Sequence, residues 1–176
     1  MTTCTPLMSQ ESKNSSNTAF LKNSLSISMR VFDIETNALR IEDITEIHCC
    51  VTGTPSGETR LYTDPEEWLF VLENAGTLIG HNIIQYDIPA IQKLYPSFKP
   101  KGRIIDTLIC SRMFWPDILE IDFKHKWETM PLKMYGRHSL EAYGHRMKQY
   151  KKHADIQDFS KLTKELAERC VCDVEV

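Results

Sequence analysis

Two acidic side chains, Asp33 and Glu35, stand two positions apart in an apolar segment that reads M-R-V-F-D-I-E-T-N-A-L from Met29. Successive side chains of a β-strand point to opposite faces, so both carboxylates are expected on one face. Within a sheet such a pair needs a neutralising cation, and hard oxygen ligands suit Mg²⁺ or Mn²⁺. The alternative is an edge strand with two solvated acids, and this segment alone does not choose between them.

Two further acids, Asp87 and Asp173, occur in separate parts of the chain. Asp87 follows a short apolar strand and a loop and stands at the start of a helix, where it is presented at the carboxyl edge of a sheet or serves only as a helix cap. Asp173 belongs to the last helix. If all four acids converge, two Mg²⁺ ions would neutralise them and hold a scissile phosphate. Such chemistry needs no protein nucleophile, and no Ser/His or Cys/His motif is evident.

The elements that must position these acids alternate between strands and helices. Strand patterns at 31–34, 45–51 and 59–62 predict an antiparallel meander. Asp64-Pro65-Glu66-Glu67 begins a helix that reaches about Asn74. A short strand at 76–80 precedes Asp87, and a strand at 104–108 leads into a helix that Asp106 caps. The pattern therefore predicts an α/β fold.

The second half of the chain is less regular. Residues 115–133, which include Pro116 and Pro131, are predicted to be irregular and to pass over the site. Ser139 caps a helix, and the last helix covers 161–176. The apolar faces of these two helices are expected to consist of Leu140, Tyr143 and Met147 in the first, and of Leu162, Leu166, Cys170 and Val174 in the second.

Composition sets outer limits on function. The 176 residues suffice for one domain, 29–176, preceded by a disordered tail, 1–28, that is rich in Ser, Thr and Asn. A net charge of −3 argues against binding DNA by phosphate neutralisation alone, but not against a nuclease whose metals hold the phosphate. Six cysteines without CxxC spacing argue against zinc and indicate reduced thiols in a cytosol-like compartment. No apolar run is long enough to span a membrane.

Five motifs together carry a family resemblance. They read D-I-E-T-N-A-L, H-N-I-I-Q-Y-D, I-D-T-L-I-C-S-R, G-R-H-S-L-E-A-Y-G-H-R-M and C-D-V-E-V, in this order along 29–176. The chain resembles the 3′→5′ proofreading exonuclease domain of family A DNA polymerases, of the type found in short-tailed bacteriophages. The first two motifs are specific together, and the long fourth block narrows the resemblance to the phage type.

The resemblance implies a ribonuclease H-like mixed sheet flanked by helices, and two Mg²⁺ ions, with Mn²⁺ able to substitute. It assigns the metal-ligand role to the four acids, places Leu39 as a wedge near the terminal base, and places Thr36 and Asn82 at the 3′ nucleotide. The implied substrate is a single-stranded or frayed DNA 3′ end. The implied partner is a separate DNA polymerase subunit, and the implied location is the cytoplasm, that of the bacterial host if a phage encodes the protein.

Two departures leave alternatives open. The family has a tyrosine four residues before its last acid, where this chain has Arg169, and the histidine version of the motif would need a histidine at Glu168. Arg169 would hold a phosphate, or would pair with the acids and weaken metal binding. No polymerase region follows Asp173, so we expect a standalone exonuclease, a split-polymerase subunit or a fragment. The alternative is a catalytically weakened module that binds DNA ends or docks to a polymerase.

Overall fold

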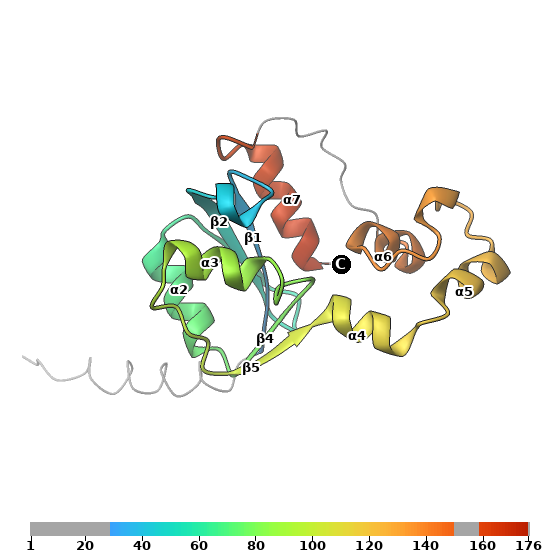
Figure 1. Ribbon diagram of the computed structural model, residues 1–176, viewed down its shortest axis with the longest axis horizontal. Coiled ribbons are helices and arrows are strands. Elements are labelled where there is room, and N and C mark those ends of the chain that lie inside the picture. Colours follow the sequence, from blue (N-terminus) through green and yellow to red (C-terminus); the bar gives the residue numbers. More distant parts are fainter. Residues whose placement is uncertain (1–28, 150–158, 176) are drawn as a thin grey trace, which may run out of the picture.

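The computed structural model describes residues 29–149 and 159–175. Five of their segments form one mixed sheet in the order β3-β2-β1-β4-β5 (Figure 1). β1 is antiparallel to β2 and parallel to β4, and β2 and β3 are antiparallel while β4 and β5 are parallel. The strands are β1 Met29–Thr36, β2 Ile47–Gly53, β3 Thr59–Tyr62, β4 Thr77–Gly80 and β5 Arg103–Asp106.

Helices cover both faces of this sheet and extend past its β5 edge. α2 and α3 pack on one face, and α7 crosses the other (Figure 1). α4, α5 and α6 form an arm beyond β5. The helices are α2 Pro65–Asn74, α3 Asp87–Leu94, α4 Thr107–Phe114, α5 Ile118–His125, α6 Leu140–Met147 and α7 Lys164–Glu175, with 3₁₀ turns η1 Ile41–Asp43 and η2 Leu132–Met134.

The alternation of side chains along β1 divides the core into two layers. Phe32 and Ile34 are buried in the layer that α2 and α3 cover, with Trp68 and Ile91. Val31 points the other way and packs in the layer beneath α7. Because strands have a side-chain period of two, Asp33 and Glu35 share the α7 side with Val31.

Three of the expected helix starts are confirmed by side-chain caps. Asp64 accepts a hydrogen bond from the Glu66 N–H at 2.9 Å, with Pro65 in the first turn of α2. Asp106 accepts from the Leu108 N–H, and Ser139 accepts from the Ala142 N–H at 3.3 Å. These caps satisfy backbone donors that a helix start would otherwise leave unpaired.

The prediction that 115–133 is irregular is wrong, because this range contains α5 and part of η2. One side chain of α5, Asp122, is held by residues later in the chain. The fully buried Asp122 carboxylate accepts hydrogen bonds from Arg146 at 2.7 and 2.9 Å, from the Gly136 N–H at 2.8 Å and from Trp127 at 2.8 Å. Although burial alone would raise it, the pKa of Asp122 is held below its ordinary value by these donors.

Two apolar faces also differ from expectation. In α6 the buried residues are Ala142 and Gly144, while Met147 is 52% exposed. In α7 Leu166, Cys170 and Val174 are buried as predicted, but Leu162 precedes the helix and is partly exposed. The predicted tail, 1–28, lies outside the described residues.

Candidate active site

Asp33 and Glu35 lie on the most central strand of the sheet, so the solvated-edge interpretation is wrong. β1 pairs with β2 from Val31 to Thr36, but with β4 only as far as Val31. The second half of β1 therefore has one side open to loops and helices. Glu35 is only 6% exposed, and a register shift between Glu35 and Thr36 ends the regular pairing.

Asp87 reaches this open side of β1 from the start of α3. Its Oδ1 accepts a hydrogen bond from the Ile34 N–H at 3.3 Å, across 53 positions of sequence. The cap position of α3 is Tyr86, and that helix start has no side-chain cap. Asp87 is therefore tied to the strand that carries Asp33 and Glu35, and the interpretation of it as a mere helix cap is wrong.

The loop between β4 and α3 is held in one shape. A Cβ atom at Gly80 would come within 2.4 Å of the Ile83 side chain and 2.7 Å of the Phe32 carbonyl, so this close approach leaves room only for glycine. Asn82 follows with a φ of 67°, in the left-handed region that Asn tolerates. The Asp106 carboxylate accepts from the N–H groups of Asn82 and Ile84, each at 3.0 Å, which fixes Asn82 at the carboxyl edge of the sheet.

α7 brings the last acid and the unexpected arginine to the same place. The Arg169 Nε lies 3.4 Å from Glu35 Oε1 and 4.0 Å from Asp173 Oδ2. The Arg169 guanidinium also lies 5.8 Å from the centre of the Phe159 ring. Because Arg169 and Asp173 are one helical turn apart, the helix presents both to β1 together.

One cavity of about 180 Å³ is lined by all eight residues that the sequence analysis selected. Four of them are acids from β1, α3 and α7, so segments distant in the sequence converge as the two-metal hypothesis requires. The eight are Asp33, Glu35, Thr36, Leu39, Asn82, Asp87, Arg169 and Asp173.

The cavity also has lining residues that the sequence analysis missed: His81, Tyr86, Leu140 and Phe159. The Tyr86 hydroxyl donates to the Ala38 carbonyl at 2.8 Å and lies 2.7 Å from the Thr36 hydroxyl. This contact holds the segment after β1, where Leu39 is 75% exposed at the cavity rim. The available signal for Tyr86 was its position next to Asp87 in the H-N-I-I-Q-Y-D motif.

Burial changes the protonation of two of these carboxyl groups, Asp33 and Asp87. Burial, followed by the charges of Asp87, Asp173 and Glu35, raises the pKa of Asp33 well above its usual value. Burial raises the pKa of Asp87 to about 7. Groups that resist ionisation in the free protein become stable anions when a divalent cation lies among them.

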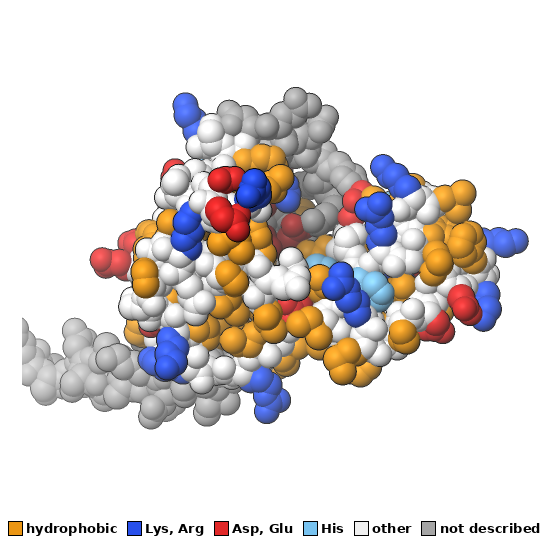
Figure 2. All heavy atoms as spheres, viewed as in Figure 1, with side chains coloured by type: hydrophobic (Ala, Val, Ile, Leu, Met, Phe, Trp, Pro, Cys, Tyr) orange, Lys and Arg blue, Asp and Glu red, His pale blue; other side chains and the backbone are white. Residues whose placement is uncertain are grey.

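The donor set fits a divalent cation of the magnesium class. Four carboxylates face one small cavity, and oxygen ligands from several carboxylates are typical of such ions. The face shown in Figure 2 has Lys and Arg side chains scattered among apolar and acidic ones. On this face the Lys and Arg side chains do not gather into one broad basic surface.

No family model matches the chain. It is 32% identical over 162 residues to the DNA-directed DNA polymerase of Escherichia phage T7, and 33% identical over 162 residues to that of Enterobacteria phage T3. Each alignment covers 84% of this chain and 23% of the polymerase, so the chain spans less than a quarter of the length of these relatives.

Solved structures share the fold at low sequence identity. The EXO domain of Aedes aegypti Nibbler has a TM-score of 0.57 at 14% identity, and the match covers 92% of this chain and 81% of that domain. Brucella melitensis NrnC also has a TM-score of 0.57 at 14% identity, and the match covers 85% of this chain and 68% of NrnC. Escherichia coli RNase D has a TM-score of 0.52 at 14% identity, and the match covers 90% of this chain and 39% of RNase D. These findings confirm the predicted ribonuclease H-like α/β fold and the resemblance of the chain to part of a phage-type DNA polymerase. Among the described residues no helix is long and apolar enough to cross a membrane.

Proposed function

We propose that the protein is a metal-dependent 3′→5′ exonuclease that removes nucleotides from single-stranded or frayed DNA 3′ ends. The observation that carries this proposal is the single cavity onto which Asp33, Glu35, Asp87 and Asp173 all face. Similarity to two phage DNA polymerases supports DNA as the substrate, and the fold shared with the Nibbler EXO domain supports a nuclease.

The four acids would hold two Mg²⁺ ions, and Mn²⁺ would substitute. When bound, the ions supply Lewis-acid activation of the attacking water and stabilise the leaving 3′ oxygen. The protein contributes preorganisation: the Ile34 N–H fixes the Asp87 carboxylate, and the sheet fixes the spacing of Asp33 and Glu35. Preorganised charge costs little rearrangement at the moment of reaction.

The other cavity residues would position the terminal nucleotide. Thr36, tied to Tyr86, and Asn82, fixed by Asp106, would contact the 3′ nucleotide. Leu39 is 75% exposed at the rim and would wedge beside the terminal base, which favours frayed ends over paired ones. The Thr36 hydroxyl and the Asn82 backbone are held by contacts within the protein, so these two residues would meet the nucleotide in a preformed arrangement.

Arg169 would bind a non-bridging phosphate oxygen once the acids hold their metals. Its Nε now lies 3.4 Å from Glu35 Oε1, where its charge neutralises part of the acidic cluster. Guanidinium groups bind carboxylate and phosphate with the same geometry, so exchange of one partner for the other needs only a side-chain rotation.

The same ion pair favours a second candidate function. If Arg169 stays on Glu35 and Asp173, metal binding is weakened and the protein acts as a module that binds DNA ends or docks to a separate polymerase subunit. If a phage encodes the protein, either function belongs to the cytoplasm of its bacterial host. Only the first function hydrolyses the DNA end.

The test is degradation of a 5′-labelled single-stranded oligonucleotide with Mg²⁺ and with Mn²⁺. The exonuclease shortens it stepwise from the 3′ end, and Asp33→Asn and Glu35→Gln each lose at least about 100-fold of this rate, since each removes a charge that would hold the ions. The matched control Asp43→Asn changes an exposed acid and keeps the rate. Intact oligonucleotide with both metals contradicts the enzyme, and retained binding of that DNA then supports the second function.

A further inference from the structure

A thiol lies directly beside two of the four acids. Cys170 is on α7, three residues before Asp173, and is fully buried against the sheet. Its Sγ donates a hydrogen bond to the Asp33 backbone carbonyl at 3.5 Å. Residues three apart lie on the same side of a helix, so Cys170 and Asp173 approach β1 together.

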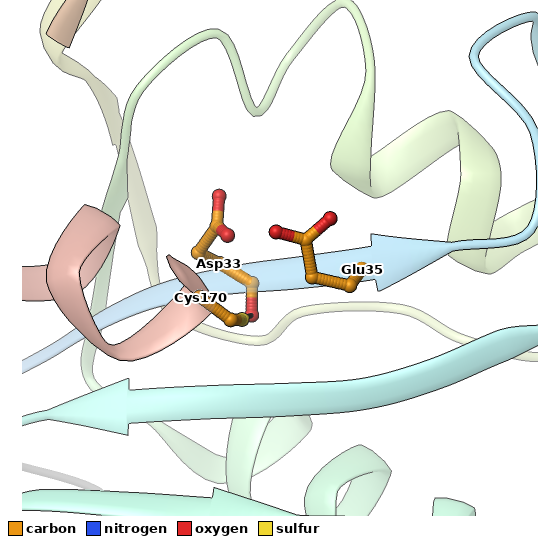
Figure 3. Close-up of side chains that lie close together, drawn as sticks. All are labelled: Asp33, Glu35 and Cys170. Carbon is orange, nitrogen blue, oxygen red and sulfur yellow. Dashed lines mark hydrogen bonds between the residues drawn. The ribbon is translucent and has the colours of Figure 1, made fainter. Parts of the chain in front are cut away.

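One thiol sulfur and two carboxylate oxygens lie close together at this point. The Cys170 Sγ, a carboxylate oxygen of Asp33 and a carboxylate oxygen of Glu35 all lie within 4.8 Å of one another. Figure 3 shows the two carboxylates on the same side of β1, with Cys170 reaching the strand from α7. Within 29–149 and 159–175, this is the group of His, Cys, Asp or Glu side chains that meets such a spacing.

The spacing is close to what one ion requires. Ligand atoms bound to a tetrahedral zinc ion at about 2.0–2.3 Å lie about 3.5 Å from one another. The three atoms would therefore need to move by about 1 Å, within the reach of side-chain rotation on a fixed backbone.

The sulfur changes which ion the site prefers. Carboxylates alone suit Mg²⁺ and Mn²⁺, whereas thiolate favours softer ions such as Zn²⁺ and Cd²⁺. We propose that Asp33, Glu35 and Cys170 form a site for a thiophilic divalent cation of the zinc class, which overlaps the magnesium site and excludes Mg²⁺ when occupied. The proposed binding of a zinc-class ion depends on these three side chains alone, whereas inhibition of the nuclease by that ion rests on the proposed exonuclease function.

This proposal departs from the expectation that the cysteines do not bind zinc. That expectation used spacing between cysteines, and the present donor set contains one cysteine and two acids from another element. The residues combine only because α7 crosses β1, which no local pattern shows.

The experiment titrates Cd²⁺ and Mn²⁺ into the metal-free full chain by calorimetry and records the ultraviolet sulfur-to-cadmium charge-transfer band. Wild type is expected to show the band and to bind Cd²⁺ at least about ten-fold more tightly than Mn²⁺. In Cys170→Ser the band disappears and Cd²⁺ affinity falls at least about ten-fold, while Mn²⁺ affinity stays within about two-fold. Prior loading with Cd²⁺ suppresses Mn²⁺ binding in wild type but not in Cys170→Ser.

Cys172→Ser is the matched control, because Cys172 is on the same helix but lines a separate surface hollow with Leu61 and Lys164. It is expected to keep the band and both affinities. If Cys170→Ser does not fold, Asp33→Asn serves instead, and loss of tight Cd²⁺ binding there supports the same site. A band that survives Cys170→Ser, or full Cd²⁺ affinity in Asp33→Asn, overturns the proposal. Neither readout uses nuclease activity, so intact oligonucleotide alone counts against the proposed function and not against this site.

Discussion

The raised pKa of Asp87 makes the stability of the metal-free protein depend on pH. This carboxyl group titrates at about 7 in the folded protein because it is buried, against an ordinary value of 3.8. The folded state therefore holds a proton that the unfolded state has released. Stability contributed by that proton is fully present below the unfolded pKa and is lost as the pH rises through the folded pKa.

The size of the effect follows from the two pKa values. One pKa unit corresponds to about 1.4 kcal/mol, so a rise from about pH 5 to about pH 8 crosses roughly two units of the Asp87 titration and costs about 3 kcal/mol of unfolding free energy. Asp33 acts in the same direction, because its pKa is also raised. Mg²⁺ should offset the loss at pH 8 by binding the ionised carboxylates.

Urea unfolding of chelator-treated protein at several pH values measures this dependence. Asp87→Asn removes this titration, so the unfolding free energy should fall by about 3 kcal/mol less between pH 5 and pH 8 than in wild type. The exposed control Asp43→Asn should show the same fall in unfolding free energy as wild type. Stability that stays level or rises over this interval in wild type would refute the reasoning. So would an Asp87→Asn variant with the wild-type slope.

Three further predictions each concern the substitution of one residue. Arg169→Ala should raise Mn²⁺ affinity about ten-fold by calorimetry, because the Arg169 Nε lies 3.4 Å from Glu35 and its side chain is 35% exposed. After screening, this ion pair opposes metal binding by about 1–2 kcal/mol. Unchanged affinity would contradict the idea that Arg169 competes with the metal for Glu35. Leu39→Ala should change the unfolding free energy by less than about 0.5 kcal/mol, since Leu39 is 75% exposed, yet reduce the preference for frayed over paired 3′ ends. Asp122→Asn should cost about 3–5 kcal/mol by leaving Arg146 buried without its counter-charge, and the exposed control Asp117→Asn should cost almost nothing in the same denaturation experiment.

Local patterns were sufficient for the part of the fold that carries the site. Alternation along β1 predicted that Asp33 and Glu35 share a face, and the Asp64-Pro65 start of α2 was read from capping chemistry alone. The convergence of Asp87 and Asp173 on β1 stayed conditional in the reasoning from the residues and was implied only by the family resemblance. It depends on chain topology, which no short window contains.

The misses have a common physical cause, which is dependence on distant contacts. Prolines stand on either side of α5, at Pro116 and Pro131, and its own residues are of mixed polarity, whereas the Arg146 that binds its Asp122 is 24 positions away. The buried residues of α6, Ala142 and Gly144, are small, whereas the periodicity of large apolar residues selected Met147 instead. Cys170 was assigned to the core correctly, but its position beside Asp33 became visible only with α7 placed on the sheet.

The central claim is that four carboxylates from distant segments hold divalent ions around one cavity. A crystal structure of the full chain with Mn²⁺ tests it most directly through anomalous scattering. The account predicts manganese peaks within ligand distance of Asp33 and shared among Glu35, Asp87 and Asp173. A well-ordered cavity without a peak, or peaks that none of these carboxylates contacts, would contradict it.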